Sequence, residues 1–123
     1  MVYNNLQHNH KQNYDKTMLK SYEFQTLSEI FKQLSDFNRI KIFLLLCHCE
    51  ECVINISSMV EMSSPAVSHH LKQLKAYGLI NSRRKGKEVY YKVADTKKTK
   101  ILHEMIESLD EIICPLNSVS KKR

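Results

Sequence analysis

A short segment near the middle of the chain, residues 47–52 with the sequence CHCEEC, holds three of the four cysteines. Thiolate sulfur and imidazole nitrogen are the ligands that Zn²⁺, Cd²⁺ and related soft or borderline ions select. Cys47 and Cys49 lie on opposite faces of a continuous helix, so they share one ion only if the helix ends there. Cys49 and Cys52 can converge across the following turn, and His48 with Cys52 is a second candidate pair. We therefore predict Cys49 and Cys52 as the main metal ligands.

Two of the cysteines have alternative roles. Cys47 extends the apolar spacing of Ile40 and Leu44, so it is equally a core residue, although it is also a candidate ligand. Cys114 stands at the predicted end of the last helix. It is a fourth thiol ligand, a redox partner or merely a helix end, and the sequence does not choose among these.

The same cysteines support two other chemistries. In a redox or sulfur-species sensor, one of the four thiols forms a disulfide or persulfide. Residues 49–52 also read C-x-x-C, the motif of thiol oxidoreductases, but the βαβ context of such enzymes is missing around them. The sequence shows no catalytic triad, phosphate-binding glycine loop or carboxylate pair in a suitable setting, so we expect no enzyme activity.

Basic charge is concentrated in residues 63–92, where seven lysines and arginines stand against a single acid, Glu88. The resulting net charge of +6 equals that of the whole chain, so the other residues are balanced. Positive charge gathered in this way favours binding to the phosphates of nucleic acid.

Residues 63–78 have the start, the stop and the face pattern of an amphipathic helix. Ser63 suits the cap, Pro65 the first turn, and Gly78 the left-handed turn that ends a helix. The inward stripe consists of Val67, Leu71, Leu74 and Tyr77. The other face is rich in hydrogen-bonding side chains and has no acid, which suits insertion into a DNA groove, although an ordinary surface helix has the same stripe.

Residues 79–93 follow as two predicted strands, 79–84 and 87–93, joined by a turn at Lys85 and Gly86. Helix and hairpin together predict a winged helix-turn-helix, in which the helix reads bases and the wing holds phosphates. The candidate DNA-binding residues are Ser63, Ser64, Pro65, Ser68, His69, Lys72, Gln73, Arg83, Arg84, Lys85, Lys87 and Tyr90.

Helical periodicity predicts four further helices around this motif. The helices are expected at 21–34, 37–47, 53–61 and 96–114. Asp36 is the predicted cap of the second of these and Asp95 that of the last. We thus expect a mainly α fold with a small β-hairpin, in the order ααααβ-βα.

The chain divides into an arm, a domain and a tail. Residues 17–115 form the predicted winged helix-turn-helix domain with its dimerisation helices, and 116–123 a short basic tail. Residues 1–16 form a flexible polar arm that carries His8 and His10. These histidines can reach a metal held elsewhere, or they are incidental residues of an unstructured tail.

The last predicted helix has a broader apolar surface than one small domain can cover. Its apolar residues are Ile101, Leu102, Met105, Ile106, Leu109, Ile112 and Ile113. Pairing with the same helix of a second copy would bury this surface, and packing within one monomer is the alternative. No apolar run is long enough to span a bilayer and no signal peptide is present, so we expect a cytoplasmic protein with reduced thiols and no membrane partner.

The run SSPAVSHHLKQLKAYGLINSRRKGKEVYYKV resembles the DNA-binding core of the ArsR/SmtB family of bacterial metal-responsive repressors. The resemblance extends over roughly residues 22–114. It implies a homodimer formed through the first and last helices, with a palindromic double-stranded DNA operator as partner. It also implies that a metal ion releases the repressor from DNA, with Zn²⁺, Cd²⁺, Pb²⁺ and As(III) as candidate effectors.

The resemblance is incomplete at both of the family's metal sites. Of the thiol motif E-L-C-V-C-D, Cys52 is kept and Ile54 replaces the second cysteine. At the second site, on the dimer helices, Asp95 and Glu111 match, but Lys97 and Ser108 stand where imidazoles belong. A neighbouring pair one helical turn apart, His103 and Glu107, is interpreted as a solvated pair rather than as metal ligands.

Overall fold

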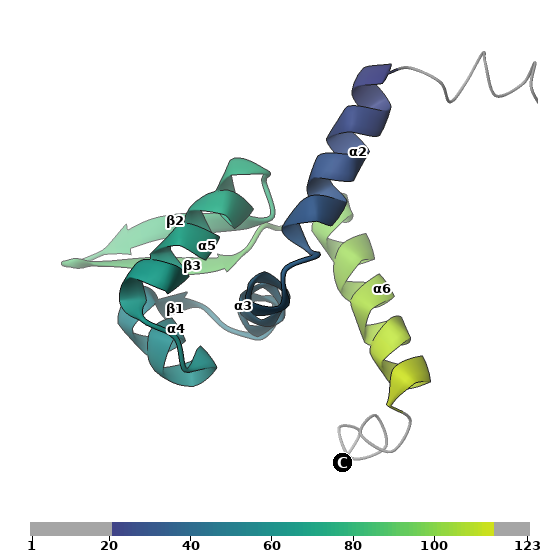
Figure 1. Ribbon diagram of the computed structural model, residues 1–123. Helices are drawn as coiled ribbons and strands as arrows, with labels where there is room; N and C mark the ends of the chain where they lie inside the picture. The colour runs from purple at the N-terminus through teal and green to yellow at the C-terminus, as the bar shows by residue number, and fades with distance from the viewer. Residues whose placement is uncertain (1–20, 115–123) are drawn as a thin grey trace, which may run out of the picture.

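The computed structural model describes residues 21–114 of the chain, so the predicted arm with His8 and His10 and the predicted tail lie outside the described residues. The elements, in chain order, are α2 (Ser21–Gln33), α3 (Phe37–His48), β1 (Glu51–Cys52), α4 (Val53–Val60), α5 (Ser64–Ala76), β2 (Ile80–Lys85), β3 (Glu88–Val93) and α6 (Lys97–Ile113). The predicted mainly helical fold with a β-hairpin is confirmed (Figure 1).

The sheet contains a short strand that the sequence did not reveal. Its order is β1-β3-β2, with both pairings antiparallel. β1 pairs Glu51 with Tyr91 and Cys52 with Tyr90, so it joins the cysteine segment to the hairpin. The hairpin turn lies at residues 86–87, one position later than expected, because Lys85 still pairs with Glu88. Gly86 takes the positive φ of 65° that this two-residue turn needs.

Helix α5 begins and ends where its sequence signals stand. Ser63 caps it by accepting a hydrogen bond from the backbone N–H of Ala66 at 3.3 Å. At its end Gly78 has a φ of 71°, and the N–H of Leu79 donates to the carbonyl oxygen of Leu74 at 2.9 Å. This pattern is the Schellman motif, which satisfies the last carbonyl groups of a helix and turns the chain directly into β2.

The core lies between α3, α4, α5 and the base of the hairpin. Its fully buried side chains are Ile42, Phe43, Leu46, Ile56, Val67, Leu71, Leu74, Leu79, Ile80 and Thr99. The inward stripe predicted for α5 is confirmed. On α3, Ile42 and Leu46 face the core, whereas Ile40 and Leu44, whose spacing suggested a core role for Cys47, are only half-buried. The physical reason is that a helix with apolar residues on most of its faces does not specify by spacing which face packs inward.

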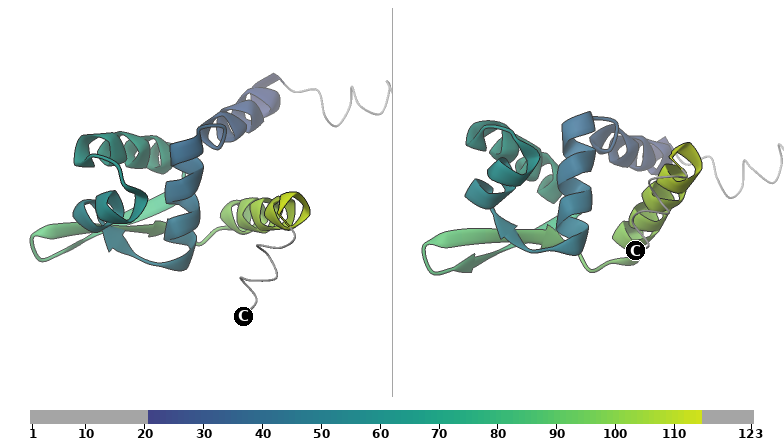
Figure 2. Two further views of the ribbon diagram at one scale, coloured as in Figure 1. Left: turned by 60° about the horizontal axis from the view of Figure 1, so that its bottom comes forward. Right: turned by 90° about the horizontal axis from the view of Figure 1, so that it is seen from below.

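Helix α3 lies between the winged body and the two outer helices α2 and α6 (Figures 1 and 2). Helix α6 is capped by Thr96, whose Oγ1 accepts from the N–H of Thr99 at 3.2 Å. The prediction of Asp95 as this cap was wrong, since its carboxylate pairs with Lys100 at 3.3 Å instead. The buried Thr99 hydroxyl donates to the carbonyl oxygen of Ala94 at 2.5 Å and so ties α6 to the end of the hairpin.

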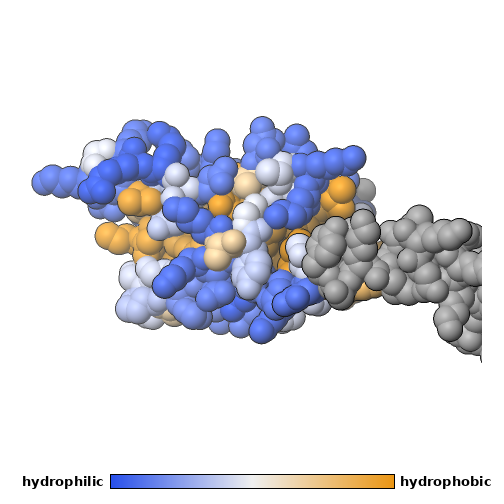
Figure 3. All heavy atoms as spheres, turned by 90° about the horizontal axis from the view of Figure 1, so that it is seen from above, coloured by the Kyte–Doolittle hydropathy of each residue, from blue (hydrophilic) through white to orange (hydrophobic). Residues whose placement is uncertain are grey.

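Both outer helices keep apolar side chains exposed. These are Phe24, Leu27 and Phe31 on α2, and Ile101, Leu109, Ile112 and Ile113 on α6, with exposed fractions from 44% to 74%. A space-filling view from above shows apolar patches among the hydrophilic surface of the molecule (Figure 3). Within residues 21–114, no helix is both long and apolar enough to cross a bilayer.

The cap of α3 makes a testable contribution to stability. The Asp36 carboxylate accepts a hydrogen bond from the Arg39 N–H at 3.0 Å, and this bond holds the pKa of Asp36 below its ordinary value. Replacing Asp36 with Ala should lower the free energy of unfolding at pH 7 by about 1 kcal/mol, measured by urea denaturation.

The pH dependence has a definite sign because the pKa of Asp36 is lowered in the folded state. The carboxylate's contribution is complete above the unfolded value of about 3.9 and is lost as the pH falls through the folded value. Asp36→Asn is the matched control, since its amide caps the helix without titrating. If D36A and D36N were equally destabilised at pH 7, the cap would not be the source of the effect.

Candidate nucleic-acid interface and metal-binding residues

The outward face of α5 is open in this structure. Its predicted DNA-binding side chains are exposed at Ser64, Pro65, Ser68, His69 and Lys72 and half-buried at Gln73. Ser63 is exposed as well, but its hydroxyl is engaged in capping the helix. The face thus presents hydroxyl, imidazole, ammonium and amide groups together, which is the set that hydrogen-bonds to base edges and phosphates.

Two polar contacts join α5 to neighbouring elements. His70 is half-buried, and its Nδ1 accepts from Arg39 Nε at 3.4 Å, while Arg39 Nη1 donates to Gln33 Oε1 at 2.5 Å. Burial lowers the pKa of His70, so the ring is neutral at pH 7. Lys75 Nζ donates to Ser82 Oγ at 2.6 Å and joins the helix to β2. The first contact fixes α5 relative to α3 and the second fixes it relative to the wing.

The wing carries its exposed cations near the turn. Arg84, Lys85 and Lys87 are exposed, and the Lys85 ammonium lies 5.9 Å from the ring centroid of the half-buried Tyr90. A two-stranded ribbon with cations at its tip suits contact with the sugar-phosphate backbone beside the groove that α5 enters.

Arg83 differs from the other wing cations because an acid of the cysteine segment holds it. Its Nε donates to Glu50 Oε2 at 2.8 Å and its Nη2 to Glu50 Oε1 at 2.6 Å. This bidentate pair keeps the pKa of Glu50 below and the pKa of Arg83 above their ordinary values. The sequence prediction treated Arg83 as free for phosphate and missed Glu50, since the two residues are 33 positions apart.

Cys47 and Cys49 are half-buried at the end of α3. Burial, with the nearby Glu107 carboxylate, raises the pKa of Cys47 to about 11. Cys49 ends the helix, its Sγ donates to the carbonyl oxygen of Leu45 at 3.3 Å, and burial together with Glu51 raises the pKa of its thiol. Both thiols are therefore protonated at neutral pH in this conformation.

Cys52 lies in β1 and is only 6% exposed. Its backbone pairs with Tyr90 of the wing, and it is also the N-cap residue of α4, the first helix of the helix-turn-helix. The expected turn between Cys49 and Cys52 therefore contains a strand. The last predicted thiol, Cys114, is half-buried at the end of α6.

The structure brings together a different group of metal-ligating side chains from the one predicted. Within residues 21–114, the group of three whose ligand atoms lie within 4.8 Å of one another consists of His48, His103 and Glu107. His48 belongs to the predicted set, and the other two were interpreted as a solvated pair. Sequence spacing alone placed His103 beside Glu107 but gave no signal that the end of α3 lies against them.

Comparisons with known proteins agree with this architecture. Residues 36–82 match the family model described as bacterial regulatory protein, arsR family. The cadmium resistance transcriptional regulatory protein CadC of Listeria innocua is 35% identical over 107 residues, which cover 86% of this chain and 90% of that protein. The chain belongs to the ArsR family. The SmtB homolog of Synechocystis, named a transcriptional repressor, is 33% identical over 71% of this chain and 66% of its own length.

Solved structures show the same fold. HlyU from Vibrio cholerae has a TM-score of 0.67 at 27% identity, covering 73% of this chain and 97% of that one. A winged helix-turn-helix DNA-binding domain from Mycobacterium bovis, described as homodimeric and possibly ArsR-family, has a TM-score of 0.68 at 27% identity, covering 77% and 88%. The predicted family, the winged helix-turn-helix fold and the role as a DNA-binding transcriptional regulator are confirmed.

The Glu50–Arg83 pair yields a prediction about affinity for DNA. Glu50→Gln should raise affinity for a random-sequence duplex and steepen its salt dependence by about 0.9, the slope of one added phosphate contact, because Arg83 is released. Arg84→Ala should lower the affinity for the same duplex and make its salt dependence less steep. Fluorescence anisotropy at several salt concentrations measures them.

The matched control for Glu50 is the neighbouring Glu51→Gln. This substitution removes the same charge. In the unmodified protein, however, the Glu51 carboxylate accepts a hydrogen bond from Asn55 Nδ2 at 2.9 Å rather than from the wing. An equal gain in affinity for E51Q would show that net charge alone is responsible. The gain of E50Q should also vanish when Arg83 is replaced by Ala.

Proposed function

We propose that this ArsR-family protein is a homodimeric repressor of transcription that a thiol-binding metal ion releases from operator DNA. One observation carries the proposal: the cysteine segment is built into the DNA-binding apparatus. Cys52 both pairs with β3 of the wing and begins α4, and the adjacent Glu50 holds Arg83 of β2. A metal ion that repositions this segment acts on the wing and on the helix that supports α5.

The names of the relatives support a metal effector. CadC of Listeria innocua is named a cadmium resistance regulatory protein. A protein of Pseudomonas putida, 39% identical over 58% of this chain and 56% of its own length, is named an arsenic resistance transcriptional regulator. Zn²⁺, Cd²⁺, Pb²⁺ and As(III) all accept thiolate ligands, so we propose an ion of this class as the effector.

In the proposed dimer, the apolar faces of α2 and α6 pack against those of a second copy. The exposed side chains on these faces have no other cover within residues 21–114 and are large, as with Ile112 at 74% exposure. The homodimeric Mycobacterium bovis domain has the same fold. A two-fold dimer would place two α5 helices in successive major grooves of a palindromic operator, about 34 Å apart.

The proposed DNA contacts are of two kinds, those of α5 to base edges and those of the wing to the sugar-phosphate backbone. Ser64, Ser68, His69, Lys72 and Gln73 on α5 would approach base edges and neighbouring phosphates, with Ser63 and Pro65 at the start of the helix. Arg84, Lys85 and Lys87, together with Tyr90 and a released Arg83, would hold the flanking backbone. Direct readout and phosphate contacts of this kind supply specificity and affinity respectively.

For the metal, we propose Cys49 and Cys52 as the principal ligands, with Cys47 and His48 secondary. Cys49 begins the two-residue connection from α3 to β1 and Cys52 is the last residue of β1, so an ion shared by their sulfurs would strain or shift this connection. The shift would be passed to α4 and β3. Coupling of metal and DNA binding needs a difference in free energy between two conformations of about 1–3 kcal/mol. His8, His10 and Cys114 remain candidates for an additional ligand.

A redox sensor on the same fold is the second candidate function. HlyU from Vibrio cholerae, which has this fold, has also been solved in a form described as reduced, with a TM-score of 0.64. Against this alternative, the raised pKa values of Cys47 and Cys49 leave few reactive thiolates at neutral pH. The C-x-x-C segment also ends in β1, which pairs antiparallel with β3 and is not part of a βαβ unit.

The metal proposal is tested by separating DNA binding from release. An operator is first selected from a randomised duplex library with the purified full chain. Cys49→Ser and Cys52→Ser should bind this operator with unchanged affinity, while Cd²⁺ no longer releases them. The ultraviolet absorbance of thiolate-to-metal charge transfer should be lost in parallel.

Cys114→Ser is the matched control, because it removes a thiol at the far end of α6. Because Cys114 is at most an additional ligand, C114S should bind operator and still be released by Cd²⁺, whereas C49S and C52S should not be released. Release of the C49S/C52S double variant by Cd²⁺ would place the thiol site elsewhere. Release by oxidant but not by Cd²⁺ in the unmodified protein would support the redox alternative.

The dimer is tested by adding a charge to its proposed interface. Ile112→Glu should convert the dimer to a monomer in sedimentation velocity and reduce operator affinity by at least tenfold, because one monomer spans only one half-site. Ile54→Glu is the matched control, since Ile54 is 64% exposed but lies on α4. A dimer that persists in I112E would contradict the assignment of α6 to the interface.

A further inference from the structure

Three side chains from two helices meet where α3 ends beside α6. His48 is the last residue of α3, and His103 and Glu107 stand one turn apart on α6. Glu107 Oε1 lies 2.9 Å from His103 Nε2 and 3.5 Å from His48 Nε2. The two imidazole rings meet edge to face, with centroids 5.1 Å apart. Both rings thus direct the same nitrogen at one carboxylate oxygen.

This donor set has the chemistry of a zinc site. Two imidazole nitrogens and one carboxylate oxygen are a known three-ligand set for Zn²⁺, with a fourth position left for water or another donor. Ligand atoms 2.0–2.1 Å from a tetrahedral ion are about 3.3 Å from one another. The 2.9 and 3.5 Å separations bracket this value, and all three ligand atoms lie within 4.8 Å of one another. The ligand atoms are thus already spaced nearly as in a formed site.

We propose that His48, His103 and Glu107 bind Zn²⁺ and thereby cross-link α3 to α6 within one chain. The donors are nitrogen and oxygen, so the site favours a borderline ion such as Zn²⁺ over the soft ions that thiolates select. The site uses no thiol and shares only His48, a secondary ligand, with the thiol site proposed above, so variants of His103 and Glu107 test it separately.

The site remains accessible in the proposed dimer. At 100° per residue, His103 is about 180° around α6 from Ile112, a residue of the exposed apolar face. A second copy packed around Ile112 leaves the His103 side uncovered. It would cover part of the groove that Leu109 and Ile113 share with His48 and Glu107, so an ion enters from the side of His103. The side chains are 63%, 29% and 44% exposed at His48, His103 and Glu107, so an ion reaches them from solvent.

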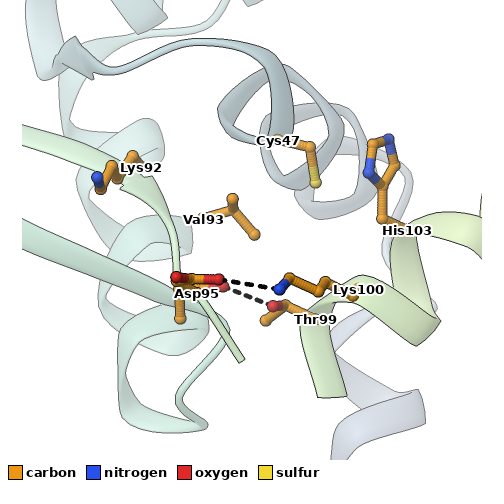
Figure 4. Close-up of a pocket in the computed structure, with 8 residues that line it drawn as sticks. Cys47, Lys92, Val93, Asp95, Thr99, Lys100 and His103 are labelled. Atoms are coloured by element: carbon orange, nitrogen blue, oxygen red, sulfur yellow. Dashed lines mark hydrogen bonds and ion pairs between the residues drawn. The ribbon is translucent and has the colours of Figure 1, made fainter. Parts of the chain in front are cut away.

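Two hollows adjoin the cluster. On one side, a groove of about 710 Å³ between α3 and α6 has His48 and Glu107 in its wall. On the other side, His103 and Cys47 line a cavity of about 270 Å³. Figure 4 shows the His103 ring beside α3 and the Cys47 side chain extending into the same cavity. There is thus room for a bound ion to keep a water ligand.

The consequence of binding follows from what the two helices do. Helix α3 continues through Cys49 into β1 and the wing, whereas α6 carries the apolar face of the proposed dimer. An ion held by both helices fixes the DNA-binding body relative to the dimer helix. Zn²⁺ should therefore raise the melting temperature of the protein, because it binds the folded chain preferentially.

The test uses the full chain with Cys49→Ser and Cys52→Ser, which removes the two principal thiol ligands. Zn²⁺ titration by calorimetry should give one ion per chain. His103→Gln and Glu107→Gln should each weaken binding by more than the roughly 10–100-fold that a change outside the ligand shell costs. Glu104→Gln, an exposed acid on the same helix, and H8Q/H10Q on the arm should leave the affinity unchanged.

Two readouts report on the site itself. Nitrogen-15 spectra of the imidazoles should show metal at Nε2 of His48 and His103, and Zn²⁺ should raise the melting temperature only where both histidines are present. Absence of stoichiometric binding, or equal affinity in E104Q and E107Q, would overturn the proposal. If the proposal for this cluster is wrong, Cd²⁺ should still release the protein with its wild-type thiols from DNA. If the proposal for the thiol site is wrong, Zn²⁺ should still bind His48, His103 and Glu107.

Discussion

The antiparallel pairing of β1 with β3 is the constraint on which the functional arrangement depends. It is only two residues long, yet it places the cysteine segment beside the wing and fixes where α4 begins. Because backbone hydrogen bonds tolerate little displacement, a shift of Cys52 must either break this pairing or move Tyr90 and β3 with it. The segment that carries the thiols is therefore mechanically part of the surface that faces DNA.

Electrostatics reinforces the same connection. The wing is strongly basic, and one of its arginines is held by a carboxylate of the cysteine segment through two hydrogen bonds. DNA phosphate and Glu50 would compete for the same guanidinium, whose fork binds either anion in a bidentate way. The pair is exposed, so its energy is modest, but the competition links the position of the cysteine segment to the number of phosphate contacts.

Helix α6 has two chemically distinct sides, and each gives it a separate role. One side exposes large apolar side chains that a small domain cannot cover, and the other places an imidazole and a carboxylate against the end of α3. The helix is anchored to the body near its start by the buried Thr99 and by Leu102. This arrangement allows its far end to be set by contacts with a second copy or with an ion.

The sequence by itself determined the recognition helix, the hairpin and the family, because these depend on local signals. Ser63, Pro65 and Gly78 mark the limits of α5, and the apolar stripe of that helix admits one inward face. The sequence also localised the cysteines to a junction between helices. Such features follow from propensity and periodicity over a few residues, which are visible without knowing the fold.

Tertiary structure alone decided which distant groups meet. The pairing of Glu50 with Arg83 and the meeting of His48 with His103 and Glu107 join residues more than 30 positions apart. The two-residue strand β1 exists only because β3 lies beside it, and the inward face of α3 was set by packing rather than by its own spacing. Long-range contacts of this kind depend on how helices and strands pack in space, and no local pattern encodes that packing.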